Sequence, residues 1–345
     1  MRNYRLAVDE NGSPFVLNSK GSIDFGYITE EMNLPPAPIR IAEGDERYGL
    51  KHIEQRHGEQ IRNNGFASTL EFVEYVAMNF SVDDKEFVAS LDWENHSAKE
   101  HYDLMRGGKR VFTTQVPQNV YYESFKKALS EGKDVLYISC SSALSASVKT
   151  ALVVAKELKT EFPDNDVYCV DSLISSLGQG YLLIQAAIKR GEGLTACETA
   201  KYIEDIRLKV NQCGTVESME YLRRAGRVKA SKAFFGNLFG VKPIIISDIK
   251  GQNFAYKKIK GSTNARAAIA DDIVKAADGN YDILLLSHAD CEEDAILLRD
   301  EILKRAEFKE VIMGYIGPIV GASVGPGTVI AFTFGKEVTI EGMNK

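Results

Sequence analysis

The sequence predicts an α/β protein with a smaller α+β unit at its N-terminus. From about residue 134, short apolar stretches typical of buried strands alternate with longer amphipathic stretches typical of helices. This alternation indicates a parallel sheet with right-handed crossovers. The rhythm changes after about residue 211, where a second α/β domain is expected, and the first 80 residues follow neither pattern.

The first large domain contains two predicted strands and three predicted helices. In chain order these are the strand 134–139, the helix 143–162, the strand 166–171 and the helices 175–193 and 195–210. Thr195 is expected to cap the last of these helices, because Glu198 follows three residues later and completes a capping box.

The second domain is expected to mix paired strands with helices. The predicted strands are 213–218, 242–247, 255–260 and 281–289, with two more in the tail 311–337, and the predicted helices are 219–228, 232–240, 264–277 and 292–307. The segment "DIKGQN" joins two of these strands in the manner of a hairpin turn.

The N-terminal part differs in composition. Residues 33–41 are proline-rich and indicate an extended connection, whereas 49–65 and 69–80 have the apolar spacing of amphipathic helices. We therefore expect three parts, namely an N-terminal α+β extension of uncertain role at 1–80, a first α/β domain at 81–210 and a second at 211–345.

Composition excludes several classes of protein. The formal net charge of −6 argues against a nucleic-acid-binding surface over the large domains. We find neither an apolar run long enough for stable membrane insertion nor a signal-peptide core. The five cysteines are scattered, which supports neither a disulfide framework nor a zinc site, so no metal is expected and a cytoplasmic location fits best.

The stretch "YISCSSALSAS" at 137–147 is the first candidate site. A strand ends there in Ser139, Cys140, Ser141 and Ser142, and a helix follows at once. Helix N-termini offer unpaired backbone N–H groups to anions, and hydroxyls add hydrogen bonds to a carboxylate. One of these serines is expected to be an ordinary helix cap, and small residues also suit close packing of a strand on a helix.

Six motifs in order make a family resemblance. They are "VFTTQVPQ" (111–118), "SCSSALSAS" (139–147), "VDSLISSLGQG" (170–180), "MEYLRRAGRV" (219–228), "GVKPIIISD" (240–248) and "IGPIVGASVGPGTVIAFTFGK" (316–336). From about residue 81 to the end, the sequence resembles the DegV family of bacterial fatty-acid-binding proteins. The resemblance implies a two-domain DegV-like fold, with a parallel sheet in the first domain and a mixed sheet in the second.

The resemblance also implies a function. A DegV-like protein buries one long-chain fatty acid between its domains, and in some bacteria it presents the carboxylate to a separate fatty acid kinase. Such a protein is a carrier without catalytic residues, and its only small molecule is the fatty acid rather than a cofactor. The kinase is thus a candidate partner for this chain.

The resemblance assigns site residues as well. Ser141 and Ser142 would receive the carboxylate with Thr114 opposite, and Ser323 stands where the family commonly has a histidine. Candidates for a further contact with the head group or the partner are Thr113, Arg223, Arg224 and Arg227. For the arginines, a solvated basic face is an equally open interpretation.

The chain departs from the family pattern at several positions. Gln115 replaces a family serine, and Ala143 and Ala146 replace family glycines. Ser323 can still donate a hydrogen bond, but it supplies no titratable cation. No counterpart of the family's first strand and its Asp-Ser motif is found in residues 1–80, which would leave a sheet edge to be covered.

Two alternatives remain open at this stage. Residues 15–80 weakly resemble nuclease-like domains associated with phages, and His52 and His57, with Glu54 and Arg56 between them, could supply acid–base chemistry. The large domains would then be a regulatory or relic module. In a third interpretation, the chain is a ligand-free interaction module. Among the other histidines, His96 and His101 are expected at the surface and His288 in a structural role, although it could line the cleft.

Overall fold

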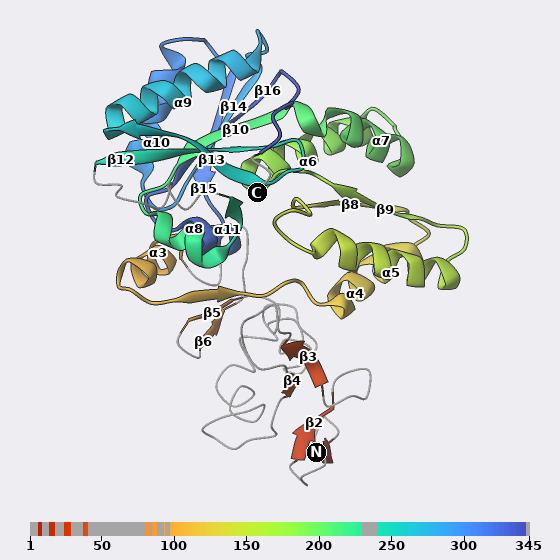
Figure 1. Ribbon diagram of the computed structural model, residues 1–345. Helices are drawn as coiled ribbons and strands as arrows, with labels where there is room; N and C mark the ends of the chain where they lie inside the picture. Colours follow the sequence, from red (N-terminus) through yellow and green to blue (C-terminus); the bar gives the residue numbers. More distant parts are fainter. Residues whose placement is uncertain are drawn as a thin grey trace. The chain divides into compact units, whose positions relative to one another are not determined.

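The structure is a computed structural model in which the contacts divide the chain into two units (Figure 1). One unit comprises Met1–Asn79 with Glu86–Val88, and the other Phe80–Lys85 with Ala89–Lys345. The structure describes residues 97–229 and 240–342, residue 93, and the short segments 6–8, 14–17, 24–28, 37–40, 80–82 and 85–87. The predicted boundary near residue 210 lies inside the larger unit and stays a prediction.

The smaller unit contains two antiparallel strand pairs in its described part. They are β1 (Leu6–Val8) with β2 (Pro14–Val16), and β3 (Asp24–Ile28) with β4 (Ala37–Arg40). The helix predicted at 49–65, together with His52, Glu54, Arg56 and His57, lies outside the described residues, as does His96. The helix predicted at 69–80 is also outside them, except that residue 80 begins a strand.

The larger unit begins with short elements. These are β5 (Phe80–Val82), α3 (Ala98–Arg106), β7 (Val111–Thr113) and α4 (Gln118–Ser130). Strand β6 (Lys85–Phe87) spans the division, because Lys85 belongs to the larger unit and Glu86 and Phe87 belong to the smaller one. Strand β5 pairs antiparallel with β7. Ser97 and Glu100 form a capping box that starts α3.

A parallel pair of strands forms the first sheet, as predicted. It consists of β8 (Val135–Ser139) and β9 (Val167–Asp171), and the helices around it are α5 (Ser147–Glu161), α6 (Ser176–Gly191) and α7 (Ala196–Ile206). Helices α4 and α5 bury one face, and α6 and α7 bury the other. The predicted capping box of Thr195 and Glu198 is confirmed.

The second sheet is mixed, as predicted. Its seven described strands run in the order β11-β13-β12-β10-β16-β14-β15, with β11–β13 and β14–β15 parallel and the other pairs antiparallel. The strands are β10 (Val210–Thr215), β11 (Val228–Lys229), β12 (Val241–Ser247), β13 (Asn253–Lys260), β14 (Ile283–His288), β15 (Glu310–Tyr315) and β16 (Val329–Phe334). The predicted helix 195–210 is shorter, because a 3₁₀ turn at Arg207–Lys209 leads directly into β10.

Helices cover both faces of the second sheet. They are α8 (Met219–Ala225), α9 (Ser262–Ala277), α10 (Glu292–Leu303) and α11 (Pro318–Val324). Helices α9 and α10 share one core with the sheet, while α8, α11 and α3 pack on the opposite face. Helix α11 was not predicted, and the helix predicted at 232–240 lies outside the described residues apart from Gly240.

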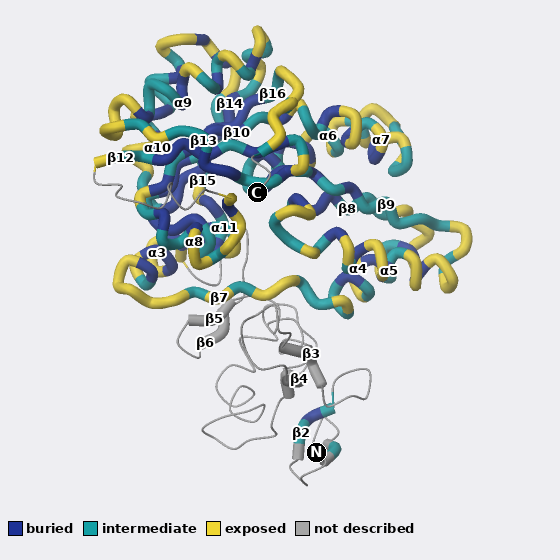
Figure 2. The backbone as a smooth tube through the Cα atoms, viewed as in Figure 1, coloured by how far each residue is buried: buried dark blue, intermediate teal, exposed yellow. Residues whose placement is uncertain are grey.

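One apolar core joins the two sheets. Ile138 and Val170 of the first sheet share it with Leu285 and Phe332 of the second, and α6 lies between them. Figure 2 shows that the central strands of the second sheet are largely buried, whereas buried and exposed residues alternate along α5. The described part of the chain contains no helix both long enough and apolar enough to span a membrane.

Candidate ligand-binding site at the end of strand β8

Ser141 lies buried just beyond β8, and its hydroxyl is already engaged. The hydroxyl donates to the backbone carbonyl of Gly251 at 2.9 Å and accepts the N–H of Ala143 at 3.2 Å. The Ser141 backbone N–H donates to the carbonyl of Ile174 at 2.9 Å. A serine hydroxyl carries one proton, so Ser141 cannot donate to a ligand until it releases Gly251.

Ser142 is exposed, and its backbone N–H is bound by a carboxylate of the protein itself. Asp171 at the end of β9 accepts this N–H at 3.1 Å and the N–H of Leu173 at the same distance. The Ser142 backbone N–H, which we expected to be available to a ligand, is therefore already occupied. The exposed hydroxyl of Ser142 is the group that faces solvent here.

The start of α5 uses two serines that the sequence analysis did not assign. The N-cap residue Ala146 has no side chain with which to cap the helix. Instead, the hydroxyl of Ser145 accepts the N–H of Ser147 at 3.2 Å, and the two hydroxyls are 2.8 Å apart. The prediction that Ser139, Ser141 or Ser142 caps the helix was wrong, because α5 begins later in the chain and its N-cap residue is Ala146. The pairing of Ser145 with Ser147 could be found only once the helix start was known.

The threonine motif, residues 111–118, is hydrogen-bonded to helix α5. Thr113 ends β7, Thr114 follows and is exposed, and the Gln115 amide donates to the hydroxyl of Thr150 in the first turn of α5. Gln115, which stands where the resemblance expects a serine, therefore connects the segment that carries Thr114 to Thr150 in the first turn of α5, three residues beyond the end of the stretch "YISCSSALSAS".

The three arginines separate into two groups. Arg223 and Arg224 are exposed and donate to Glu220 at 2.8 to 2.9 Å, and these hydrogen bonds lower the pKa of Glu220 to about 2. Arg227 instead extends its Nε to 3.4 Å from the carbonyl oxygen of Leu144, within the serine segment. Among the three, Arg227 is the one with a recorded contact to that segment in the described residues.

Ser323 lies in α11, which packs against α8, α3 and β7. It is half-buried. Its helix therefore contacts both the strand that leads to Thr114 and the helix that precedes Arg227. Ser323, at the position where the family commonly has a histidine, therefore lies in a helix that packs against the elements next to Thr114 and Arg227.

The two described histidines are both buried. His288 ends β14, accepts the N–H of Cys291 at 3.4 Å and has its pKa lowered by burial, as expected of a structural residue. The prediction that His101 lies at the surface was wrong. Helix α3 turns His101 inward, where its ring packs against two aromatic rings. The ring centroids are 5.4 Å apart for His101 and Trp93, and 5.1 Å apart for His101 and Tyr102.

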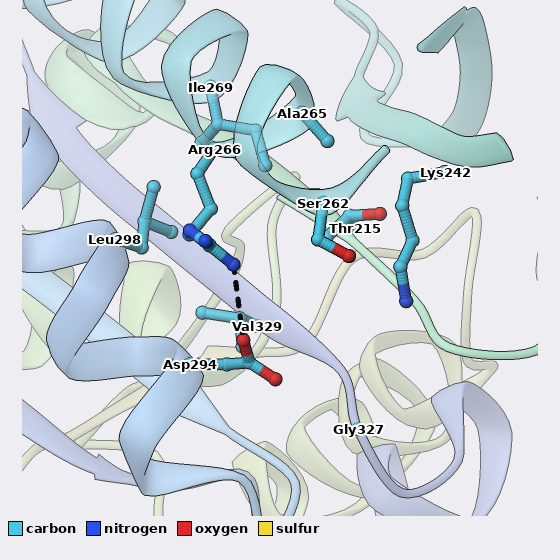
Figure 3. Close-up of a pocket in the computed structure, with 10 residues that line it drawn as sticks. All are labelled: Thr215, Lys242, Ser262, Ala265, Arg266, Ile269, Asp294, Leu298, Gly327 and Val329. Carbon is cyan, nitrogen blue, oxygen red and sulfur yellow. Dashed lines mark hydrogen bonds and ion pairs between the residues drawn. The ribbon is translucent and has the colours of Figure 1, made fainter. Parts of the chain in front are cut away.

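A small cavity of about 30 Å³ lies elsewhere in the larger unit (Figure 3). It is lined by Thr215, Lys242, Ser262, Ala265, Arg266, Ile269, Asp294, Leu298, Gly327 and Val329. Arg266 and Asp294 pair across it at 3.3 Å. This volume suits a water molecule rather than an acyl chain, and none of the predicted site residues lines it.

No cluster of metal-ligating side chains occurs among the described residues.

Comparison with known proteins now identifies the family. Residues 69–336 match a family model described as an uncharacterised protein of the DegV family, so this chain belongs to the DegV family. A DegV domain-containing protein of Clostridium perfringens is 29% identical over 264 residues, which cover 76% of this chain and 90% of the relative. One from Streptococcus pyogenes is 29% identical over 233 residues, covering 67% and 80%.

Solved structures show the same fold. A DegV family protein from Thermus thermophilus, described as fatty acid binding, has a TM-score of 0.67 at 24% identity and covers 75% of this chain and 90% of its own. A protein from Ruminococcus gnavus, described with vaccenic acid, has a TM-score of 0.66 at 19% identity, covering 74% and 89%. The fold of residues 97–336 in its described parts is thus that of the DegV family.

Proposed function

We propose that this chain binds one long-chain fatty acid between two α/β domains, with the ligand's carboxylate held where β8 ends. The observation that carries the proposal is the meeting of distant segments at this point. Thr150 accepts from Gln115, Gly251 accepts from Ser141, and Arg227 approaches Leu144. Three proteins of similar fold are described with vaccenic, heptadecanoic or stearic acid, which favours the same ligand class here.

Each proposed contact has its own reason. The exposed hydroxyls of Thr114 and Ser142 are available to donate to a carboxylate, and Ser323 would add a third donor from α11. Ser141 would join them by exchanging the Gly251 carbonyl for the ligand. Such an exchange is favourable because a hydrogen bond to a charged acceptor is roughly twice as strong as one to a neutral carbonyl.

Most of the affinity would come from the acyl chain. Burying about 14 methylene groups at roughly 0.8 kcal/mol each contributes on the order of 11 kcal/mol as an upper limit. The loss of freedom on binding opposes this by about 4 kcal/mol or more. The hydroxyl groups would therefore mainly orient the ligand.

In this proposal the chain is a cytoplasmic carrier without a catalytic residue, and a separate fatty acid kinase would act on the presented carboxylate. Arg223 and Arg224, which Glu220 holds on the exposed face of α8, are suited to contact such a partner, and Thr113 is a further candidate. A charge reversal, Arg223→Glu with Arg224→Glu, should slow acyl-phosphate formation by an added kinase while leaving fatty acid binding intact.

The binding itself is tested by titrating the delipidated full chain with oleate. The double variant Thr114→Ala, Ser142→Ala should bind oleate at least tenfold more weakly, since each hydrogen bond to a charged group contributes about 1.5–3 kcal/mol. Thr160→Ala removes an exposed hydroxyl near the far end of α5 and serves as the matched control. If the wild-type chain does not bind oleate, the proposed function is wrong, and a ligand-free interaction module becomes the better account.

A further inference from the structure

The turn between β12 and β13 is closed by a buried carboxylate. Asp248 is 5% exposed, and its Oδ1 accepts the N–H groups of Lys250 and Gln252, each at 2.9 Å. The Asp248 N–H donates to the carbonyl of Gln252 at 3.0 Å, and its own carbonyl accepts the N–H of Gly251 at 2.9 Å. Charge-assisted bonds of this kind hold the turn in one conformation.

The C-terminal segment fixes the same turn from another side. Ile340 accepts the N–H of Ile249 at 3.0 Å, and the N–H of Gly342 donates to Asp248 Oδ2 at 3.2 Å. The turn is therefore attached to the chain both through its strands and through residues that follow the last strand of the sheet. These hydrogen bonds from two sides therefore fix the conformation of the tip of the turn.

This tip contacts two groups of the candidate site. The Gly251 carbonyl accepts the Ser141 hydroxyl at 2.9 Å, and the Gln252 side-chain amide donates to the backbone carbonyl of Arg227 at 2.9 Å. Arg227 in turn approaches Leu144 in the serine segment. A single turn of the second sheet therefore holds both Ser141 and Arg227.

Gly251 leaves no room for a side chain at this contact. Its φ of +71° lies in the left-handed region, and a Cβ there would be 2.3 Å from Ser141 Oγ and 2.7 Å from Leu173 Cα. Any other residue would have to displace the Ser141 hydroxyl or the backbone after β9. The close approach of the turn is thus built around glycine.

We propose that Gly251 and Gln252 are positioning residues for the carboxylate site. Gly251 would hold the Ser141 side chain beside the site until the ligand's carboxylate replaces the Gly251 carbonyl as acceptor of the Ser141 hydroxyl. Gln252 would orient the backbone that carries Arg227, while Asp248 and the C-terminal segment hold the turn in place. This inference rests on the proposed function. It predicts that the turn governs how well the chain distinguishes a carboxylate from a neutral head group, and not how well it binds an acyl chain.

The test compares two ligands that share one chain. Oleate and oleyl alcohol are titrated into the delipidated full-length protein, and the ratio of their dissociation constants measures recognition of the head group alone. The variants are Gly251→Ala and Gln252→Ala. The matched control is Gly240→Ala, because Gly240 has a similar φ of +67° but no atom of the described residues lies within 4 Å of the added Cβ. Both glycine substitutions therefore carry similar backbone strain, and only one reaches the site.

Gly251→Ala should lower the preference for oleate about tenfold, the size of one lost hydrogen bond to a charged group, and Gln252→Ala should lower it about threefold. Affinity for oleyl alcohol should stay nearly unchanged in both, and Gly240→Ala should keep the wild-type ratio. If Gly251→Ala does not fold, Gln252→Ala decides. An unchanged ratio in the folded variants, or an equal loss for both ligands, overturns the inference while fatty acid binding stands. A wild-type chain that binds neither ligand overturns the proposed function itself.

Discussion

The carboxylate of Asp171 accepts the backbone N–H of Ser142 at 3.1 Å, directly beside the segment proposed to receive a ligand's carboxylate. Two negative groups that face one set of donors repel each other, and the repulsion is strong where water is partly excluded. Asp171 therefore stabilises the empty site and should oppose an anionic ligand.

Asp171→Asn should strengthen oleate binding about threefold to tenfold, because the neutral amide removes this repulsion and its oxygen can still accept the two N–H groups. The variant should also unfold more easily by about 1 kcal/mol, since neutral acceptors bind more weakly. Isothermal titration and urea unfolding measure the two effects. Asp134→Asn is the matched control, because Asp134 accepts the Asp166 N–H at 2.9 Å at the opposite end of β8. Weaker oleate binding by Asp171→Asn would contradict the placement of the carboxylate.

Arg227→Gln should weaken oleate binding about threefold to tenfold, because it removes a cation that contacts Leu144 in the serine segment. Arg223→Gln is the comparison, since that guanidinium is already bound by Glu220 and has no recorded contact with the segment. Equilibrium binding of each variant to oleate checks the difference. Equal effects of the two substitutions would show that only the overall surface charge matters.

Gly178→Ala should destabilise the fold by about 1–3 kcal/mol, even though alanine is the better helix former. The added Cβ would lie 2.6 Å from Ile174 Cδ1 and 2.8 Å from Phe332 Cδ1, where α6 meets the second sheet. Gly180→Ala lies in the same helix with its nearest neighbour at 3.9 Å, so it should be neutral or stabilising. Urea unfolding of both variants measures this contrast. A stable Gly178→Ala protein would mean that the two sheets do not share a tightly packed core.

Alkaline conditions should destabilise the protein. Burial, with a smaller contribution from the nearby Asp171 charge, raises the pKa of the Cys140 thiol to about 11, and burial raises that of Cys169 to about 11. In the unfolded chain these thiols ionise near pH 8.5, so the unfolded state loses protons first. The stability they contribute is complete below that value and is lost as the pH rises towards 11. Urea unfolding from pH 8 to pH 11 should show that the free energy of unfolding falls with rising pH. The fall should be shallower in the double variant Cys140→Ser, Cys169→Ala. A flat or rising free energy of unfolding in the wild-type protein would contradict the burial of these thiols.

Much of the fold could be predicted because it is encoded locally. The alternation of apolar strands with helices indicated β8, α5, β9 and α6, and Glu198 three residues after Thr195 indicated the start of α7. Helix α11 was missed because "PIVGASV" is short and contains one glycine and three β-branched residues, which are poor helix formers. His101 was misplaced because a histidine on an amphipathic helix gives no local sign of the aromatic neighbours that bury it.

The candidate site could be predicted only in part. The strand end and its serines are visible in "YISCSSALSAS", but the partner of Ser141 is Gly251, which is 110 residues away. Such a bond is set by how the two sheets pack, and no local pattern encodes it. The same holds for the approach of Arg227 to Leu144, whereas the binding of Arg223 and Arg224 to Glu220 follows from helical spacing alone.

The central claim is that this chain carries one fatty acid. The most direct measurement is native mass spectrometry of the full chain purified from cells, followed by denaturing extraction and lipid analysis. The account predicts a mass increase matching one long-chain fatty acid, recovered at nearly one per chain from the wild-type protein and at a lower ratio from the Thr114→Ala, Ser142→Ala variant. A wild-type protein of unmodified mass that yields no acyl chain, before and after incubation with oleate, would contradict it.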